Sequence, residues 1–241
     1  MTPPPNLWAR ATMVVRPRDL RDVYARPDLE VRRLAGHALR PVATGYWAIP
    51  PIERLDDPDW RPEVEALALG LAVADYGVKA TALMAASAAR FHGALPRALG
   101  TAVVAVPKQR PALDTAYGRI VFVKRQTDRL ELTRARTPMV TGYVTTIEQT
   151  MLDIAHRPTL GDLATTEAAE AIRALALRAD WTETLALAKE QRIPAAYVRA
   201  RWVAENVVPE DTPILKPRTP VPGLHLWPAD DEASFFGIQK S

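Results

Sequence analysis

The chain has 241 residues, with 31 basic and 28 acidic side chains and no cysteine. The lack of cysteine excludes a disulfide framework and a thiolate metal site, and it fits a reducing cytoplasm. No apolar run approaches the roughly 20 residues that span a bilayer, and no basic segment precedes an apolar core at the N-terminus, as a signal peptide requires. We therefore expect a cytoplasmic protein without a membrane partner, with two small domains or one domain and an appendage.

The positive charge is concentrated at the N-terminus. Residues 1–50 contain eight arginines, no lysine and four acids, a net +4, whereas the other 191 residues contain 23 basic and 24 acidic side chains, a net −1. This asymmetry is typical of a nucleic-acid-binding module joined to a neutral domain. A guanidinium binds a phosphate or a guanine edge through two hydrogen bonds, which an ammonium does not. A high-GC coding bias also explains arginine in place of lysine, but it explains the clustering less well.

Two short helices are predicted in this basic segment. Pro17 suits the first position of a helix, where its missing N–H costs nothing. This helix is expected to end near Ala25, because Pro27 disfavours a helical conformation of the residue before it. A second helix is expected from about Asp28, whose carboxylate can cap it, to Gly36, a common C-terminal stop. Its predicted inward residues are Val31, Leu34 and Ala35.

The second helix has an outward basic stripe. Glu30, Arg33 and His37 share one side, with Arg32 beside them. Two helices joined by a tight turn, with such a stripe on the second, form the arrangement that places a recognition helix in the major groove of DNA. A solvated helix face is the alternative for the two arginines.

The next residues are predicted to form a β-hairpin, or wing, that turns at 43–45, with 13–15 as a third strand. Tyr46 and Trp47 alternatively form the core of this hairpin. Only about ten residues precede Met13, so the core of this domain needs either one turn at 7–9 or apolar surface from the second domain. The residues expected to contact double-stranded operator DNA are Arg16, Arg18, Arg21, Glu30, Arg32, Arg33, His37, Arg40, Thr44 and Tyr46.

An acidic segment punctuated by proline, 55–62, is the expected linker. Its aspartates are interpreted as a turn that caps the next helix. A metal cluster is less favoured, because no histidine or further carboxylate lies nearby in the sequence. These aspartates are Asp56, Asp57 and Asp59. The expected domains are a winged helix-turn-helix DNA-binding domain at 1–54, an α/β domain at 63–205 and a proline-rich C-terminal extension at 206–241.

The second domain is expected to begin with a core pair of apolar helices at 63–76 and 80–91. Four β-prone runs with short separations then predict a mostly antiparallel sheet, and four helices follow, the first with a capping box at Thr145 or Thr146. The predicted fold class is α+β: an N-terminal winged helix-turn-helix, then a mixed α/β domain with a mostly antiparallel sheet and C-terminal helices. The expected strands are 101–106, 120–124, 130–133 and 139–145, and the helices are 147–155, 164–177, 181–190 and 194–205.

Two motifs of the second domain are distinctive. They are Ser87-Ala88-Ala89-Arg90-Phe91-His92-Gly93 at a helix end and Thr145-Thr146-Ile147-Glu148-Gln149-Thr150-Met151-Leu152-Asp153 after a strand. Together with the Gly45-Tyr46 step that leads into Pro50, the chain resembles the AbiEi family of type IV antitoxins over residues 16 to about 205. The family often has arginine where this chain has Gln149, so a role of that arginine is not carried over.

The resemblance implies a function. AbiEi proteins are antitoxins that pair with a nucleotidyltransferase-like toxin, usually encoded next door. They repress their own operon by binding inverted repeats through the N-terminal winged helix, and the C-terminal domain is associated with antitoxicity. The chain is thus expected to be an antitoxin and a DNA-binding transcriptional autorepressor. Two alternatives stay open: an enzyme that neutralises the toxin by covalent modification such as phosphorylation, and a ligand-responsive transcription regulator unrelated to toxins.

Motifs for catalysis are mostly missing. The four histidines are far apart, and none lies at i, i+4 from another ligand in a zinc pattern. No phosphate-binding glycine-rich loop and no kinase-type motif is present. His92 at a helix end and Asp153 within a helix are expected to have structural roles. We expect no catalytic residue, no metal and no cofactor, which favours a non-enzymatic protein without deciding the matter.

Two further segments are candidates for contacts, the basic strand region and the proline-rich C-terminal segment. The basic residues of the strand region, expected as a surface for DNA, for the toxin or for water alone, are Lys108, Arg110, Lys124, Arg125, Arg134 and Arg136. The segment from Val207 onward is rich in proline and is expected to be an extended strap. Its apolar side chains are expected to pack on the body of the protein in preference to a partner, and they are Leu224, Leu226, Trp227, Phe235, Phe236 and Ile238.

Overall fold

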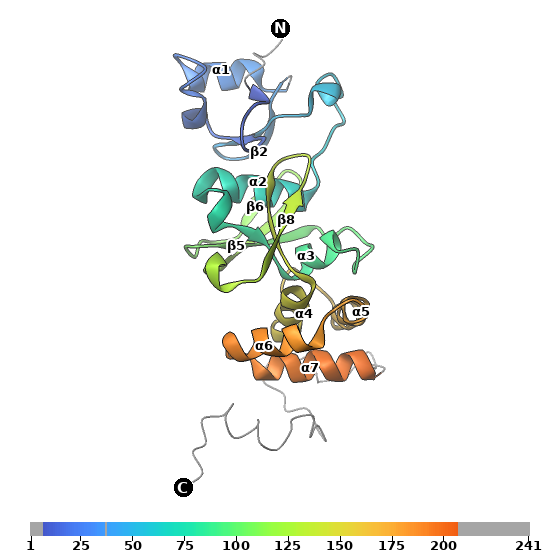
Figure 1. Cartoon of the computed structure of the whole chain (residues 1–241). Helices are drawn as coiled ribbons and strands as arrows, with labels where there is room; N and C mark the ends of the chain where they lie inside the picture. Colours follow the sequence, from blue (N-terminus) through green and yellow to red (C-terminus); the bar gives the residue numbers. More distant parts are fainter. Residues whose placement is uncertain (1–6, 37, 207–241) are drawn as a thin grey trace. The chain divides into compact units, whose positions relative to one another are not determined.

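A computed structural model describes residues 7–36 and 38–206. The architecture is α+β, with seven α-helices and a mixed sheet within these residues (Figure 1). The described residues form two compact units: the first contains 7–83, 99–128 and 132–144, and the second contains 84–98, 129–131 and 145–206. The expected linker at 55–62 lies inside the first unit, so the domain division stays a prediction. His37 and the strap from Val207 onward lie outside the described residues.

Residues 7–54, which we call the N-terminal module, form a small helical and stranded part of the first unit. A 3₁₀ helix at Pro17–Leu20 precedes α1 (Pro27–Leu34), and three antiparallel strands pair in the order β1-β3-β2. The strands are β1 (Val14–Val15), β2 (Arg40–Ala43) and β3 (Tyr46–Ala48). The predicted hairpin and its third strand are confirmed. A second 3₁₀ helix, Ile52–Arg54, ends the module.

The helices of the N-terminal module differ from the expected ones at their ends. The first is a 3₁₀ turn that stops at Leu20, in place of a helix to Ala25. Helix α1 begins at Pro27, so Asp28 lies within its first turn and is not its cap. Ala35 is exposed, contrary to the expected inward position, because the chain leaves the helix after Leu34.

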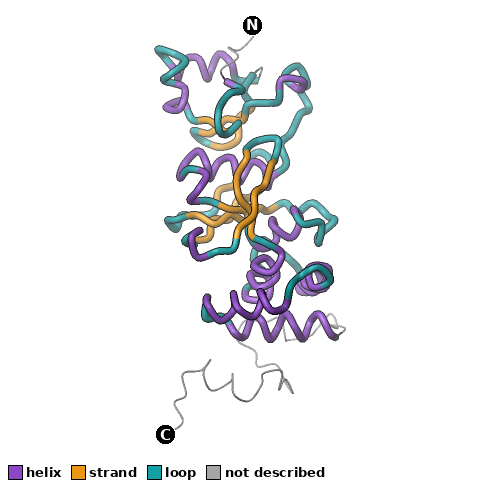
Figure 2. The backbone as a smooth tube through the Cα atoms, viewed as in Figure 1, coloured by secondary structure: helices purple, strands orange, loops and turns teal. Residues whose placement is uncertain are grey.

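The central sheet of the first unit has six strands in the order β6-β7-β5-β4-β9-β8, drawn in orange in Figure 2. They are β4 (Ala82–Leu83), β5 (Thr101–Val106), β6 (Leu113–Thr115), β7 (Gly118–Lys124), β8 (Leu132–Arg136) and β9 (Thr141–Thr145). The pairs β4–β5 and β6–β7 are antiparallel, and β5–β7 and β4–β9 are parallel. When the sheet of the N-terminal module is included, both parallel and antiparallel strand pairs occur, and most pairs are antiparallel. Strand β6 is an element that the sequence did not predict.

One predicted helix is wrong over its first half. Residues 80–91 were expected to be a single helix, but Ala82–Leu83 form strand β4 and only Ala85–Phe91 form a helix, α3. Strand β4 lies between β5 and β9 and is completely buried. A short apolar run of this kind has no periodicity that distinguishes a buried strand from a buried helix. Helix α3 also belongs to the second unit and not to a core pair with α2 (Val64–Tyr76).

The N-terminal module shares a hydrophobic core with the sheet. Helix α2 is buried on all sides over its first three turns, because it packs against β5 and β7 and also against β1. Val14, Val42 and Ala48 of the module belong to the same apolar cluster as the inner residues of α2 and β5. The module also has a cluster of its own, with Leu7 fully buried beside Leu20. The core of the N-terminal module is therefore completed both by residues at 7–9 and by apolar surface from α2 and the sheet.

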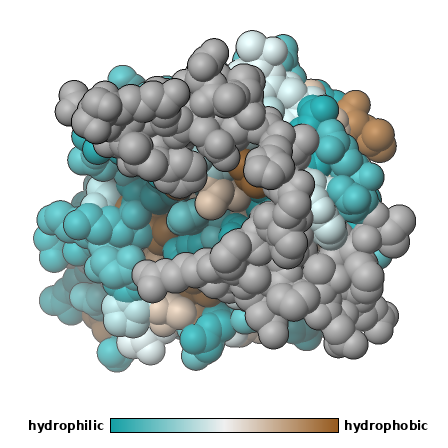
Figure 3. Space-filling model, turned by 90° about the horizontal axis from the view of Figure 1, so that it is seen from below, coloured by the Kyte–Doolittle hydropathy of each residue, from teal (hydrophilic) through white to brown (hydrophobic). Residues whose placement is uncertain are grey.

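The second unit is helical, and its four long helices agree with the predicted ones. They are α4 (Ile147–His156), α5 (Thr165–Ala176), α6 (Trp181–Glu190) and α7 (Pro194–Glu205). Thr146 caps α4 by accepting a hydrogen bond from the backbone N–H of Gln149, and Asp180 caps α6. Seen from the α6–α7 end, the described surface is mainly hydrophilic, with hydrophobic residues in small separate areas (Figure 3). No helix among the described residues is long and apolar enough to cross a membrane.

Candidate nucleic-acid interface

Helix α1 has a buried side and an exposed side. Val31 and Leu34 are 2% and 3% exposed and belong to the core of the N-terminal module. Leu29, Arg32 and Arg33 are exposed, and their spacing of three and four residues places them on neighbouring parts of the helix surface. The outer side of α1 therefore carries two guanidinium groups, the carboxylate of Asp28 and one large apolar side chain.

Two of the predicted contact residues on α1 pair with each other. Arg33 donates a 2.9 Å hydrogen bond from Nε to the carboxylate of Glu30, three residues earlier, while its side chain stays 52% exposed. Exposed pairs of this kind contribute only a few tenths of a kcal/mol to a helix, so Arg33 can exchange this partner for another anion. Arg32 is exposed and has no acidic partner among the described residues.

Three further predicted contact residues are on the surface of the N-terminal module. Arg18 follows Pro17 in the 3₁₀ helix, and its side chain is 63% exposed, with Asp75 at 3.9 Å. Arg21, directly after that helix, and Thr44, at the turn of the β2–β3 hairpin, are also exposed.

Arg16 is not on this surface. Its guanidinium donates hydrogen bonds of 2.8 and 2.9 Å to Asp19 and further ones to Asp75 and to the carbonyl oxygen of Ala74, and its side chain is 13% exposed. Burial acts to lower the pKa of Arg16, but the hydrogen bond and charge of Asp19, together with Asp75, raise that pKa above its ordinary value. We therefore correct the predicted set by removing Arg16, because its charge is already balanced inside the protein.

Arg40 and Tyr46 are removed because their polar groups make hydrogen bonds inside the first unit. Arg40 is only 7% exposed because it lies on the inner face of β2, and its Nη2 donates hydrogen bonds to the carbonyl oxygens of Leu55 at 3.3 Å and Asp57 at 3.1 Å. The phenol of Tyr46 donates a 2.8 Å hydrogen bond to Asp75. Both side chains connect the hairpin to the rest of the first unit.

Asp75 lies at the centre of a group that the sequence analysis missed, and we call it the Asp75 cluster: Asp75, Arg16, Tyr46 and Arg110. Arg110 donates a 2.6 Å hydrogen bond to the carboxylate of Asp75, and its guanidinium lies over the ring of Phe122, 4.3 Å from the centroid. Burial raises the pKa of Tyr46, and its hydrogen bond to Asp75 adds to this. The cluster joins residues 16, 46, 75 and 110, which are far apart in the sequence, so no local motif indicates it.

The sequence analysis also missed Arg26 and Leu29. Arg26 is the residue before α1 and is exposed, and Leu29 is 52% exposed. The available signal for Arg26 was Pro27, which marks the start of a helix and so places the preceding side chain at its N-terminal end. With these two residues, the exposed interface residues of the module are Arg18, Arg21, Arg26, Leu29, Arg32, Arg33 and Thr44.

The six basic residues of the strand region differ in their exposure. Arg110 is bound within the Asp75 cluster, and Arg125 is only partly exposed. The exposed members are Lys108, Lys124, Arg134 and Arg136. The exposed arginines near α1 are closer together in the sequence than these four residues.

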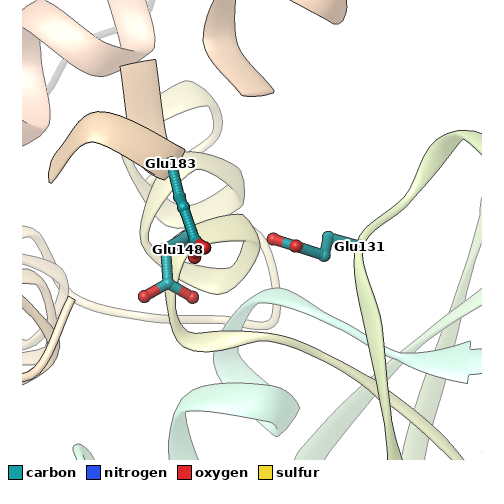
Figure 4. Close-up of side chains that lie close together, drawn as sticks. All are labelled: Glu131, Glu148 and Glu183. Carbon is teal, nitrogen blue, oxygen red and sulfur yellow. The ribbon is translucent and has the colours of Figure 1, made fainter. Parts of the chain in front are cut away.

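Three carboxylates of the second unit lie close together. Oxygen atoms of Glu131, Glu148 and Glu183 are within 4.8 Å of one another, although the residues come from three separate segments (Figure 4). Glu148 accepts a 3.0 Å hydrogen bond from the backbone of Asp180, and Glu131 accepts one of 3.1 Å from Thr146. The charge of Glu131 raises the pKa of Glu183, with smaller contributions from burial, Asp180 and Glu148. The carboxylates of Glu131, Glu148 and Glu183 therefore repel one another.

The fold and the interface define an α+β protein in which a basic helix and hairpin share a core with a mixed sheet. No protein-family model matches the chain, and no curated protein matches it. The crystal structure of the RV2827C protein from Mycobacterium tuberculosis is similar, with a TM-score of 0.56 and 19% sequence identity over 83% of this chain and 74% of that one. This likeness concerns the fold.

Proposed function

We propose that this protein is an AbiEi-type antitoxin that represses its own operon by binding double-stranded operator DNA. In this proposal the N-terminal module is a winged helix-turn-helix, α1 is its recognition helix and the β2–β3 hairpin is its wing. The exposed side of α1, with Arg32 and Arg33, is the observation that carries the DNA-binding part. The antitoxin part depends on the two motifs that resemble the family.

The dimensions and charge of the module suit a DNA duplex. An α-helix with its side chains is about 10–12 Å across, close to the width of the major groove, about 12 Å. Because Arg32 and Arg33 lie on the exposed side of α1 and its opposite side is the module's core, α1 can enter the groove without unfolding the module. The exposed turn at Thr44 offers a contact to a neighbouring phosphate, as wings do.

The second unit supports the family resemblance through a contact between the two motifs. His92 of the first motif lies at the C-terminal end of α3, and its Nε2 is 2.7 Å from the carbonyl oxygen of Thr145 in the second motif. The hydroxyls of Thr145 and Thr150 are also 2.7 Å apart, and both residues are buried. The motifs are therefore two parts of one packed structure, which supports the use of both in the resemblance.

A gel-shift experiment tests the DNA-binding part. The full chain is expected to bind the region upstream of its own gene, and Arg32→Ala with Arg33→Ala should weaken binding by roughly 1–3 kcal/mol for each side chain that reads a base. A matched control, Arg119→Ala with Lys124→Ala, removes two exposed cations from β7 and should bind like the unmodified protein. Equal binding by both double variants would refute the assignment of α1.

A growth and mass-spectrometry experiment tests the antitoxin part. A nucleotidyltransferase-like protein encoded beside this chain should arrest growth when expressed alone, and co-expression of this chain should restore growth. The toxin recovered from restored cells should have its unmodified mass if neutralisation is by binding or repression alone. A covalent adduct would replace this account by enzymatic neutralisation, and growth arrest that this chain fails to relieve would reject the antitoxin function.

A further inference from the structure

Leu29 is an apolar side chain in an unusual place. It is 52% exposed and lies in the third position of α1, whereas Val31 and Leu34 of the same helix are buried. Leu29 thus differs from the other aliphatic residues of α1, and it lies on the side of the helix that the proposed function places against DNA.

Three arginines and the exposed carboxylate of Asp28 lie near Leu29. Arg26 precedes it by three residues, and Arg32 and Arg33 follow it by three and four, so all three lie on adjoining parts of the α1 surface and all are exposed. A protein-binding patch is normally a larger contiguous apolar area. Here a single apolar group is flanked by guanidinium groups, which instead suits a polyanion that presents an occasional apolar group.

The acids of α1 favour base edges over phosphates. Glu30 is held by Arg33, and Asp28 is exposed in the first turn. A carboxylate is repelled by a phosphate but accepts a hydrogen bond from the amino group of cytosine. The first turn of α1, which contains Leu29, is thus suited to the floor of the groove, where the N-terminal residues of recognition helices contact bases.

We propose that Leu29 reads thymine, by packing against its C5-methyl group in the major groove. This inference rests on the proposed function, because it assumes that α1 binds duplex DNA. The thymine methyl is the apolar group that base pairs present in this groove, and the flanking arginines bind guanine or phosphate on either side of it. The target is therefore a duplex with a thymine in each bound site.

Replacement of thymine by deoxyuridine tests the proposal, because it removes only the methyl group. The shortest duplex that the full chain protects in footprinting is prepared with thymine and with deoxyuridine at each thymine position in turn. At one such position per site, the unmodified protein should bind about threefold to fivefold more weakly to the deoxyuridine duplex, as expected for the loss of one buried methyl. Leu29→Ala should bind the two duplexes equally.

Leu177→Ala is the matched control, since Leu177 is an 88% exposed leucine at the end of α5 in the second unit. It should keep the full preference for thymine. If the unmodified protein binds DNA but does not distinguish thymine from deoxyuridine, or if Leu29→Ala keeps the preference, the inference is wrong while DNA binding stands. If the unmodified protein binds no duplex, both proposals fail. A changed oligomeric state of Leu29→Ala without a thymine effect would assign Leu29 to a protein contact instead.

Discussion

The hydroxyl of Tyr46 in β3 donates a 2.8 Å hydrogen bond to the carboxylate of Asp75, one residue before the end of α2. A negative charge at the C-terminal end of a helix is unfavourable by itself. Arg16 and Arg110 bind the same carboxylate and offset this cost. The position of the hairpin on the first unit is therefore fixed by a charge network as well as by the shared apolar core.

Asp75→Asn is expected to lower the free energy of unfolding by about 2–4 kcal/mol. The substitution leaves two largely buried guanidinium groups without their shared counter-charge, which costs more than the loss of an exposed pair. Urea denaturation of the full chain measures the change. Asp114→Asn is the control, since its pair with Arg119 is 80% exposed on the carboxylate side and should contribute at most about 1 kcal/mol. Similar losses in the two variants would mean that the Asp75 cluster contributes no more to the free energy of unfolding than an exposed ion pair does.

Arg32→Ala and Arg40→Ala are expected to act on different properties. If Arg32 neutralises a phosphate, its loss should reduce the slope of log affinity against log salt by about 0.9 and change stability by less than about 0.5 kcal/mol. Arg40→Ala should keep the salt slope but destabilise the protein by about 1–3 kcal/mol, because two partly buried hydrogen bonds to carbonyl groups are lost together with the packing of a buried side chain. DNA titrations at several salt concentrations and thermal unfolding check the pair. A reduced slope for Arg40→Ala would restore it to the DNA interface.

Glu183→Gln is expected to stabilise the protein at neutral pH. The raised pKa of Glu183 means that its charged form is disfavoured in the folded state, chiefly by Glu131, although the first turn of α6 favours a negative charge. The folded protein thus binds the proton more tightly than the unfolded chain, so the penalty is full above the raised pKa. It fades as the pH falls and is absent below about 4.3, the pKa of an unfolded glutamic acid.

Thermal unfolding at a series of pH values measures this effect. The melting temperature of Glu183→Gln should exceed that of the unmodified protein at pH 7, and the two should converge near pH 4. Glu170→Gln, an exposed acid on α5, should show no such difference. A lower melting temperature of Glu183→Gln at pH 7 would show that the three carboxylates stabilise one another through something other than their own charges.

Gly118→Ala is expected to destabilise the sheet by several kcal/mol. Gly118 begins β7 with φ of +140°, which disfavours any other residue, and an added Cβ would lie 2.6 Å from the backbone oxygen of Gly100. Because the nearest atom belongs to the backbone of Gly100, no side-chain rotation relieves that clash, and Cγ2 of Val64 would lie only 2.9 Å from the added Cβ as well. Urea denaturation should show the loss, and Gly100→Ala, with nothing within 4 Å of its added Cβ, should be nearly neutral. A stable Gly118→Ala protein would contradict the β5–β7 register.

Local sequence predicted the elements whose signals lie within a few residues. The four long helices of the second unit have apolar periodicity and end signals, and α6 and α7 coincide with the expected ranges. Strand β5 also coincides, because β-branched residues fill a run bounded by Gly100 and Pro107. The hairpin followed from its turn residues. Strand β4 did not, since an apolar run suits either a buried strand or a buried helix.

The N-terminal charge and the helix that carries it were thus determined by the sequence, because composition and periodicity are local properties. Which arginines reach solvent was decided only by the tertiary structure. Arg16 is exposed in any isolated peptide, but in the folded chain it meets Asp75, 59 residues away, and Arg40 faces inward because β2 is covered on that side. A guanidinium can bind DNA only where folding leaves it on the surface, and the burial of Arg16 and Arg40 depends on contacts that are distant in sequence.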